Sequence, residues 1–374
     1  MMGGLRYVEE FRDPLLGRSM LQALRRMAQR LSKSSVRIME FCGGHTYAFH
    51  RFGLLELLPP EIRMVHGPGC PVCILPKGRI DAAIKLCLEK KAVLATYGDV
   101  LRVPGSHSLT LMKARSMGAD VRIVLSAMEA LDLAEKLPGQ EVVFFAIGFE
   151  TTTPPTAAVV LEADRRNLKN FSVFANHVMT PPAMEAILSG TSVDGIIGPS
   201  HVSTVIGSRA YDVISRKFNI PIVIAGFEPL DILQALQMIL QQIEEKKAQV
   251  ENEYSRAVIP EGNLRSQELI AKVFEHAPSF EWRGLGELPL SSRDIRKEFS
   301  FFDAQRRFSL ELLHVSDPGI CECGEILKGV KAPQDCKIFG TVCTPDNPVG
   351  ACMVSAEGAC AAVFHYGRRE GAVS

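Results

Sequence analysis

The sequence predicts an α/β protein in which two similar parallel-sheet lobes enclose a cleft and a third, partly helical domain follows. Between residues 35 and 226, short apolar runs alternate with amphipathic segments of helical period, such as residues 79–91 (RIDAAIKLCLEKK). Continuous apolar runs are typical of parallel strands covered by helices. After Gly226 the alternation stops, and residues 321–374 hold six of the ten cysteines with little periodicity.

The apolar runs define the expected strands, which are, in chain order, residues 36–41, 62–67, 92–98, 121–126, 142–148, 171–177, 194–199 and 220–226. Eight expected strands are more than one small sheet holds. Residues 118–126 (GADVRIVLS) resemble the start of a second series of strands and helices. We therefore expect α/β lobe I over residues 35–118 and α/β lobe II over residues 119–226.

The remaining segments flank these lobes. Residues 1–34 are expected to form a helical arm that packs on the C-terminal domain. Residues 227–374 are expected to form that domain, which begins with one long helix over residues 228–256. Its last part is poor in apolar periodicity, so we expect it to fold around something other than an apolar core.

The composition excludes several kinds of partner. Lys plus Arg and Asp plus Glu both total 42, and the chain has no long basic run, so neither nucleic acid nor an anionic membrane is expected as a partner. The charged N-terminus does not resemble a signal peptide, and no segment approaches the roughly 18 apolar residues of a membrane span. We expect a soluble, cytoplasmic protein, in which cysteines favour metal binding or catalysis over disulfides.

Polar residues gather where the expected strands end. Ligands of open parallel sheets bind beyond the carboxyl ends of the strands, because loops and helix N-termini converge there. One cleft between the lobes would collect this set: Cys42, His45, Cys70, Cys73, Asp99, Glu150, His177, His201 and Glu228. The glutamates fit helix caps equally well, and each histidine alone fits a hydrogen-bonded structural role.

Two cysteines lie two residues apart in HGPGCPVC, residues 66–73, just before an expected helix. The helix N-terminus and Lys77 or Arg79 would favour a thiolate, which is the signature of a redox couple at Cys70 and Cys73. Half of a zinc site and a pair of inert buried thiols are the alternatives. Cys42, flanked by glycine, suits a soft transition metal, whereas Cys87 lies on an apolar helix face and is expected in the core.

The C-terminal cysteines have a spacing of their own. Cys323, Cys336, Cys343 and Cys360 give C-x12-C-x6-C-x16-C, which lacks the close C-x2-C pairs of most structural zinc domains. Four thiolates gathered from loops, amid Gly, Pro and apolar residues, favour a cubane iron–sulfur cluster over zinc. Cys321 and Cys352 are then surplus.

Several long motifs, in order along nearly the whole chain, resemble the hydrogenase maturation factor HypD family. They are EFCGGHTYAFHRFGL, HGPGCPVC, IGFETTTPPTA, NHVMTPPAMEAIL, GPSHVSTVIG, AGFEPLDIL and CTPDNPVGACMVSAEGACAA. The resemblance implies two α/β lobes around a cleft and a third domain that carries the cluster. It also implies a scaffold on which cyanide and carbon monoxide are attached to the iron of nickel–iron hydrogenases.

By the same resemblance, Cys42 helps to hold that iron, and Cys70 and Cys73 are the redox pair. The resemblance also implies a [4Fe-4S] cluster bound by Cys323, Cys336, Cys343 and Cys360, and Cys321 stands close enough to Cys323 to exchange roles with it. Separately, we expect His45 to orient the Cys42 thiolate or to lower its pKa. The implied partners are the chaperone HypC, HypE, which presents the cyanide precursor, and indirectly the hydrogenase large subunit. A thiol–disulfide reductase similar to ferredoxin–thioredoxin reductase and a structural metal-binding adaptor are the alternatives.

Overall fold

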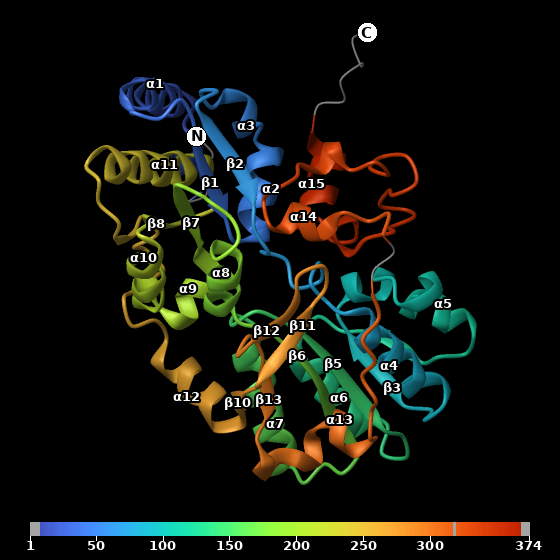
Figure 1. The fold of residues 1–374 in the computed structure, drawn as a ribbon. Coiled ribbons are helices and arrows are strands. Elements are labelled where there is room, and N and C mark those ends of the chain that lie inside the picture. Colours follow the sequence, from blue (N-terminus) through green and yellow to red (C-terminus); the bar gives the residue numbers. More distant parts are fainter. Residues whose placement is uncertain (1–7, 317–318, 368–374) are drawn as a thin grey trace, which may run out of the picture.

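The computed structural model describes residues 8–316 and 319–367 and contains two parallel sheets, one above the other in Figure 1. The first sheet has the order β2-β1-β7-β8-β9, with β1 Val36–Glu40, β2 Ile62–His66, β7 Gly195–Pro199, β8 Ile222–Ala225 and β9 Val250–Asn252. The second has the order β4-β3-β5-β6, with β3 Val93–Thr96, β4 Val121–Ile123, β5 Val142–Gly148 and β6 Phe171–His177. The α/β class expected from the sequence is confirmed.

The sheets are not divided where the sequence suggested. The expected boundary between residues 118 and 119 falls between β3 and β4, which are hydrogen-bonded neighbours in the second sheet. The first sheet instead joins β1 and β2 to β7 and β8, which lie beyond that boundary. An apolar run predicts a strand but does not show which strand it pairs with. The sequence pattern therefore could not show that the chain crosses to the second sheet after β2 and returns to the first sheet at β7.

Helices cover both faces of the first sheet. One face, including Ile38 and Val223, packs against α1 Pro14–Arg30, α2 Gly43–Arg51, α3 Leu54–Leu57 and α11 Pro229–Glu244. The other, including Met39 and Ile222, packs against α8 Thr180–Leu188 and α10 Asp212–Phe218, and α9 Ser200–Ile206 follows β7. Alternate side chains of each strand thus pack against the helices on opposite faces of the sheet.

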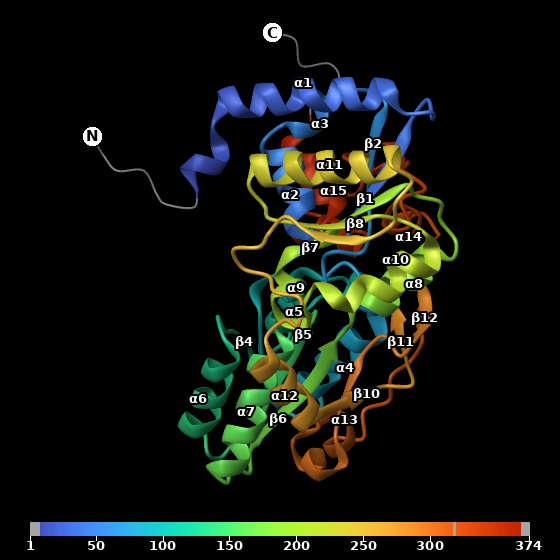
Figure 2. The same ribbon diagram turned by 90° about the vertical axis from the view of Figure 1, so that its left-hand side faces the viewer.

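The N-terminal arm lies along α11, as Figure 2 shows. The side chain of Asp13 caps α1 by accepting the backbone N–H groups of Leu15 and Leu16, and Pro14 occupies the first helical position. Helix α11 is shorter than the expected helix over residues 228–256. It ends at Glu244, Lys246 adopts a positive φ of 55°, and residues 250–252 return as edge strand β9.

The second sheet is covered in the same way. Helices α4 Lys77–Leu88 and α5 Leu111–Ser116 cover one face, and α6 Ala127–Lys136, α7 Thr153–Arg165 and α12 Leu264–Val273 cover the other. Two short antiparallel pairs complete this part, β10 Phe274–His276 with β13 Arg293–Ile295 and β11 Ser279–Trp282 with β12 Gly286–Pro289, beside helix α13 Ala304–Arg307.

Residues 319–367, here called the cysteine-rich segment, contain two α-helices, α14 Cys323–Leu327 and α15 Ala359–Tyr366. Helix α15 packs on α2, and the segment's buried cysteines share a core with residues of α4 (Figure 1). The segment therefore meets the loops at the carboxyl ends of the strands. Within the residues that the structure describes, no helix is long and apolar enough to cross a membrane.

Candidate functional site

A cavity of about 510 Å³ lies where the loops of both sheets meet the cysteine-rich segment. Its lining includes Cys42 and Cys70 from the first sheet's loops, Asp99 and Phe149 from the second sheet's loops, and Glu357 from the cysteine-rich segment. This cavity, here called the central cleft, therefore brings together side chains that lie far apart in the sequence. The sequence did not single out Glu357, because no strand pattern precedes it.

Cys42 lies two residues after the end of β1 and directly before α2. It adopts an extended conformation as the N-cap residue, so the backbone N–H groups of Gly44 and His45 point at its thiol and lower its pKa. Burial is the stronger effect and, with the charge of Glu357, raises the pKa of Cys42 well above its usual value. The free thiol is thus neutral, and a cation in the cleft would convert it to a thiolate ligand.

The buried carboxylate of Glu40 fixes the chain beneath Cys42. One oxygen, Oε2, accepts the backbone N–H of Cys42 at 2.9 Å. The other, Oε1, accepts the hydroxyl of Thr46 and lies 2.9 Å from Nδ1 of His66. Since Glu40 is fully buried, its three partners hold the start of α2 in one position.

His45 is buried against the first sheet. Its Nε2 lies 3.0 Å from the carbonyl oxygens of Ala225 and Gly226, and its ring packs on Phe227. Burial lowers the pKa of His45 and keeps it neutral. The expected role of orienting the Cys42 thiolate is therefore indirect in this geometry, since these hydrogen bonds anchor the first turn of α2 to β8.

The loop that carries Cys70 lies directly against Cys42. The backbone N–H of Gly43 donates to the carbonyl of Gly69 at 3.1 Å. A Cβ atom on Gly69 would lie 2.4 Å from the nitrogen of Gly43 and 2.6 Å from Cα of Cys42. Only glycine permits this approach, which places the Cys70 loop and Cys42 at the same cleft.

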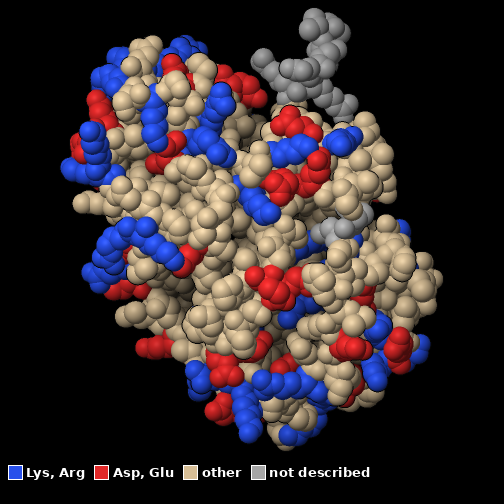
Figure 3. All heavy atoms as spheres, viewed as in Figure 1, with Lys and Arg blue, Asp and Glu red and all other residues tan. Residues whose placement is uncertain are grey.

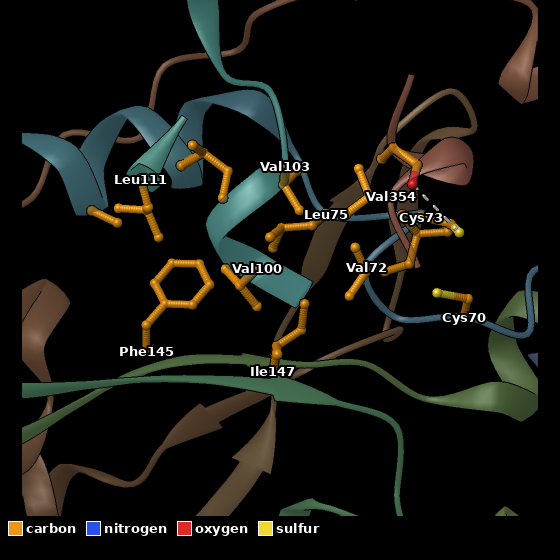
Figure 4. Close-up of a cluster of buried hydrophobic side chains, with 14 of the residues drawn as sticks. Cys70, Val72, Cys73, Leu75, Val100, Val103, Leu111, Phe145, Ile147 and Val354 are labelled. Carbon is orange, nitrogen blue, oxygen red and sulfur yellow. Dashed lines mark hydrogen bonds between the residues drawn. The ribbon is translucent and has the colours of Figure 1, made fainter. Parts of the chain in front are cut away.

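Cys70 and Cys73 are both buried and belong to one turn, in which the N–H of Cys73 donates to the carbonyl of Cys70 at 3.1 Å. Figure 4 shows their thiols at one end of the hydrophobic cluster, with Cys73 turned toward the cysteine-rich segment. The Cys73 thiol donates to the carbonyl of Ala351 at 3.9 Å. Its interactions with Cys352 and Cys70, together with burial, raise its pKa.

Lys77 and Arg79, which were expected to favour a thiolate at this pair, have partners of their own. The Nζ of Lys77 donates to the carbonyl of Ser316. Arg79 is buried beside the rings of Phe174 and Phe280 and donates to the carbonyl of Ala175. A thiolate favoured by these cations stays a prediction.

Cys352, which the spacing argument left surplus, lies at the centre of the thiol contacts. It receives hydrogen bonds from Cys323, Cys360 and Cys73, which lower its pKa well below the usual value of a thiol. The same contacts raise the pKa of Cys360. Cys352 therefore links the Cys70–Cys73 turn to the cysteines expected to bind a cluster.

The other C-terminal cysteines surround this centre. The sulfurs of Cys321 and Cys323 are 3.2 Å apart, and Cys343 accepts the backbone N–H of Val349 at 3.4 Å. Cys336 packs on the same core and interacts with the side chain of Glu322. Among the residues with a described position, no three or more His, Cys, Asp or Glu side chains are arranged to hold a single metal ion.

The other strand-end residues divide between the cleft and the core. Asp99 and His201 line the cleft, whereas Glu150 is buried and accepts the N–H and hydroxyl of Thr180 at the start of α8. Glu228 forms a capping box at the start of α11. The alternative that each glutamate caps the helix after it is thus confirmed for Glu228. It is wrong for Glu150, which accepts from Thr180 at the start of α8 and not from the start of α7.

Two further side chains have structural places. His177 is buried with Nε2 3.0 Å from the hydroxyl of Thr156, and burial lowers its pKa to about 3. Cys87 is in the core, as expected, and burial raises its pKa to about 12. Neither side chain lines the central cleft.

Two α/β sheets share a thiol-lined cleft with a cysteine-rich segment, which is an arrangement suited to metal binding or to thiol redox chemistry. The family model described as "HypD: Hydrogenase formation hypA family" matches residues 16–367. The chain therefore belongs to the HypD family.

Curated relatives match over almost their entire length. The HypD maturation factor of Azotobacter vinelandii is 55% identical over 99% of both chains. That of Cupriavidus necator is 53% identical over 97% of this chain and 98% of the relative. That of Escherichia coli K12 is 43% identical over 98% and 99%. The resemblance found in the sequence motifs is thereby confirmed.

Proposed function

We propose that this protein is the scaffold on which the iron of a nickel–iron hydrogenase receives its cyanide and carbon monoxide ligands. The observation that carries the proposal is the position of Cys42, whose thiol lines the central cleft with Cys70 and Glu357. A thiolate is a soft donor suited to iron bearing such ligands. The iron is cargo, because the protein gives it up to the hydrogenase.

The residues around Cys42 suit temporary binding. The N–H groups of Gly44 and His45 that point at the thiol also stabilise a thiolate, and Glu40 keeps the backbone of Cys42 fixed. Gly43 and Gly69 allow the two loops to pack directly against each other, which keeps Cys42 and Cys70 at the same cleft. His45 acts by anchoring α2, which holds the thiol at the cleft.

Cys70 and Cys73 are proposed as the thiol–disulfide couple. Release of cyanide from a thiol-bound precursor consumes two electrons, and oxidation of two thiols to a disulfide supplies two. The two thiols belong to one turn and interact with each other, and Cys70 lines the central cleft with Cys42, which supports this pairing. The contact of Cys73 with Cys352 gives the couple a neighbour through which it is reduced again.

Cys323, Cys336, Cys343 and Cys360 are proposed as ligands of a [4Fe-4S] cluster. The donor set fits: Cys323 and Cys360 share contacts with Cys352, and Cys343 accepts a backbone N–H, an interaction that tunes such clusters. Each thiolate of a cubane binds a different iron atom, so this ligand set differs from that of a single ion. When bound, the cluster supplies electrons one at a time.

The partners proposed are HypC at the central cleft, HypE as the donor of cyanide, and through them the hydrogenase large subunit. The alternative, a reductase similar to ferredoxin–thioredoxin reductase, is favoured by the contact between Cys73 and Cys352. That function would need no thiol at Cys42. Membership of the HypD family and the Cys42 site therefore favour the scaffold.

The experiment that tests the proposal is anaerobic purification of this protein with and without coexpressed HypC. We expect about four iron and four sulfide per chain without HypC, from a single cubane. With HypC, we expect additional iron that carries infrared bands of cyanide and carbon monoxide. Bound zinc without acid-labile sulfide would contradict the cluster, and absence of the extra iron would favour the reductase.

A further inference from the structure

A second cavity, of about 750 Å³, lies outside the central cleft along β2, which is the edge strand of the first sheet. All five residues of β2 line it. One wall is formed by α2 and α3 through His50, Leu55 and Leu58, and the other by residues 329–334 of the cysteine-rich segment. This cavity is here called the β2-edge groove. Strand β2 forms its base and the two walls its sides, so it has the shape of a channel for an extended chain.

The backbone of β2 has an open side. The N–H of Val36 donates to the carbonyl of Glu61, and the N–H of Gly67 donates to that of Glu40, so residues 61, 63, 65 and 67 face β1. Backbone groups of alternate strand residues point to opposite sides of the strand. Met64 and His66 therefore direct their N–H and C=O groups away from β1 and into the groove. Among the described residues no backbone group pairs with them.

The groove is positively charged. Three cationic side chains line it, Arg37, Arg63 and Lys331, together with His50 and His66, and no carboxylate does. Burial lowers the pKa of His50 to about 4, so His50 is neutral. Figure 3 shows Lys and Arg side chains in the region of β2, and Lys, Arg, Asp and Glu side chains side by side along its boundary with the cysteine-rich segment. His66 is paired with Glu40 and Lys331 with Glu322, which leaves Arg37 and Arg63 to set the charge.

These two arginines are placed differently. The guanidinium of Arg37 donates to the carbonyls of Ser192 and Gly329, which fix it without neutralising it. Arg63 is exposed on the edge strand itself, on the same face of the sheet as Arg37. An anionic chain lying along β2 would therefore meet one fixed and one adaptable cation.

We propose that the β2-edge groove binds an extended acidic peptide segment of a partner protein, which adds as a further strand beside β2. The backbone groups of Met64 and His66 would supply ladder hydrogen bonds, and Arg37 and Arg63 would select acidic side chains. His50, which is nine-tenths buried in the wall, has an Nε2 without a described partner and offers one more polar contact. The proposal does not depend on the iron chemistry of the central cleft.

Charge and an open strand edge together favour a peptide over a free anion. Phosphate or free glutamate would engage the arginines but not the ladder, whereas a peptide of about five residues spans β2 at roughly 3.3 Å per residue. Exposed edges also invite unwanted pairing, and the charge of Arg63 discourages neutral or basic strands. The groove is thus selective for acidic segments.

The test uses the full-length protein and a fluorescent peptide, acetyl-Glu-Val-Glu-Val-Glu-amide, with binding followed by anisotropy. We expect saturable binding that Arg63→Glu weakens at least about tenfold, because like charges then face each other. Lys136→Glu, on exposed α6 of the other sheet, is the matched control and should bind like the unchanged protein. The same peptide with lysine for glutamate should not bind.

Two further measurements separate strand addition from simple charge attraction. Methylation of the peptide's backbone nitrogens should weaken binding at least about tenfold, since ladder hydrogen bonds are lost. Amide exchange at Met64 and His66 should slow when the peptide binds, while Arg63 and Val65, already paired with β1, should not change.

The proposal would be overturned by equal binding of the methylated peptide, by equal binding of the lysine peptide, or by no binding at all. It would also be overturned if the amides of Met64 and His66 were protected before peptide was added. In that case the groove is filled by this chain's own terminus or by a second copy.

Discussion

The thiol of Cys73 donates a hydrogen bond to the carbonyl of Ala351 at 3.9 Å, so the Cys70–Cys73 turn contacts the cysteine-rich segment one residue before Cys352. A Cβ on Gly358 would lie 3.0 Å from the Cys73 sulfur and 2.3 Å from the carbonyl of Cys352. Glycine at this position therefore permits the contact. Under the proposed function, this contact is the route by which electrons from the cysteine-rich segment reach the thiol pair.

Replacement of Cys352 tests this route. Cys352→Ala should leave Cys70 and Cys73 able to form a disulfide but slow their reduction several-fold, because thiol exchange requires direct approach of sulfurs. Differential alkylation at timed intervals after anaerobic addition of dithionite would measure the rate. Cys87→Ala, which removes a buried thiol elsewhere in the core, is the control. Equal rates in both variants would exclude Cys352 from the route.

The cluster ligands can be separated from their neighbours by colour. Cys343→Ala should abolish the brown absorption of the anaerobic protein, because a cubane that loses a thiolate ligand is unstable. Cys321→Ala and Cys352→Ala should keep most of it. Loss of colour in Cys321→Ala with retention in Cys323→Ala would show that these neighbours, whose sulfurs are 3.2 Å apart, have exchanged roles.

The close approach of the two cleft loops depends on Gly69. Gly69→Ala should destabilise the fold by about 1–3 kcal/mol, as overpacking typically does, because the new Cβ meets the backbone of Cys42 and Gly43. Thermal unfolding would measure the change. Gly139→Ala is a matched control, since no atom lies within 4 Å of its added Cβ. Similar unfolding temperatures for both variants would contradict the loop contact.

Stability should depend on pH through Glu253. Burial and the nearby carboxylate of Asp231 raise the pKa of Glu253 to about 7, against the opposing effect of a hydrogen bond from Gly226. The folded state thus holds this proton more tightly than the unfolded chain, and the stability it contributes is complete below the usual pKa of 4.5 and is lost as the pH rises through 7.

Comparison with Glu253→Gln isolates this effect. Between about pH 5 and about pH 8, the melting temperature of the unchanged protein should fall relative to that of the variant, which cannot ionise at this position. Circular dichroism at both pH values would measure it. A constant difference between the two proteins would mean that Glu253 titrates normally.

The sequence predicted the strands of this fold better than their pairing. The runs at residues 142–148 and 171–177 coincide with β5 and β6, because continuous apolar runs report burial on both faces. Which strands pair depends on where the chain crosses between layers, and the pattern carries no sign of that.

The site shows the same division. Cys42 and Cys70 were found because they follow strands that meet at one cleft. The role of Cys352 was missed, since spacing along the tail reports ligands within one segment and not a contact with a thiol from another part of the chain. Glu357 was missed for a similar reason, as it enters the cleft from a turn without periodic sequence.

The most direct test of the account is the infrared spectrum of the complex of this protein with HypC, compared between the unchanged protein and Cys42→Ala. The unchanged complex should show cyanide and carbonyl stretching bands. Cys42→Ala should lose these bands and keep the brown cluster absorption, because Cys42 lies at the central cleft and the proposed cluster cysteines lie in the cysteine-rich segment. Bands of full intensity in Cys42→Ala would contradict the assignment of the iron to this thiol.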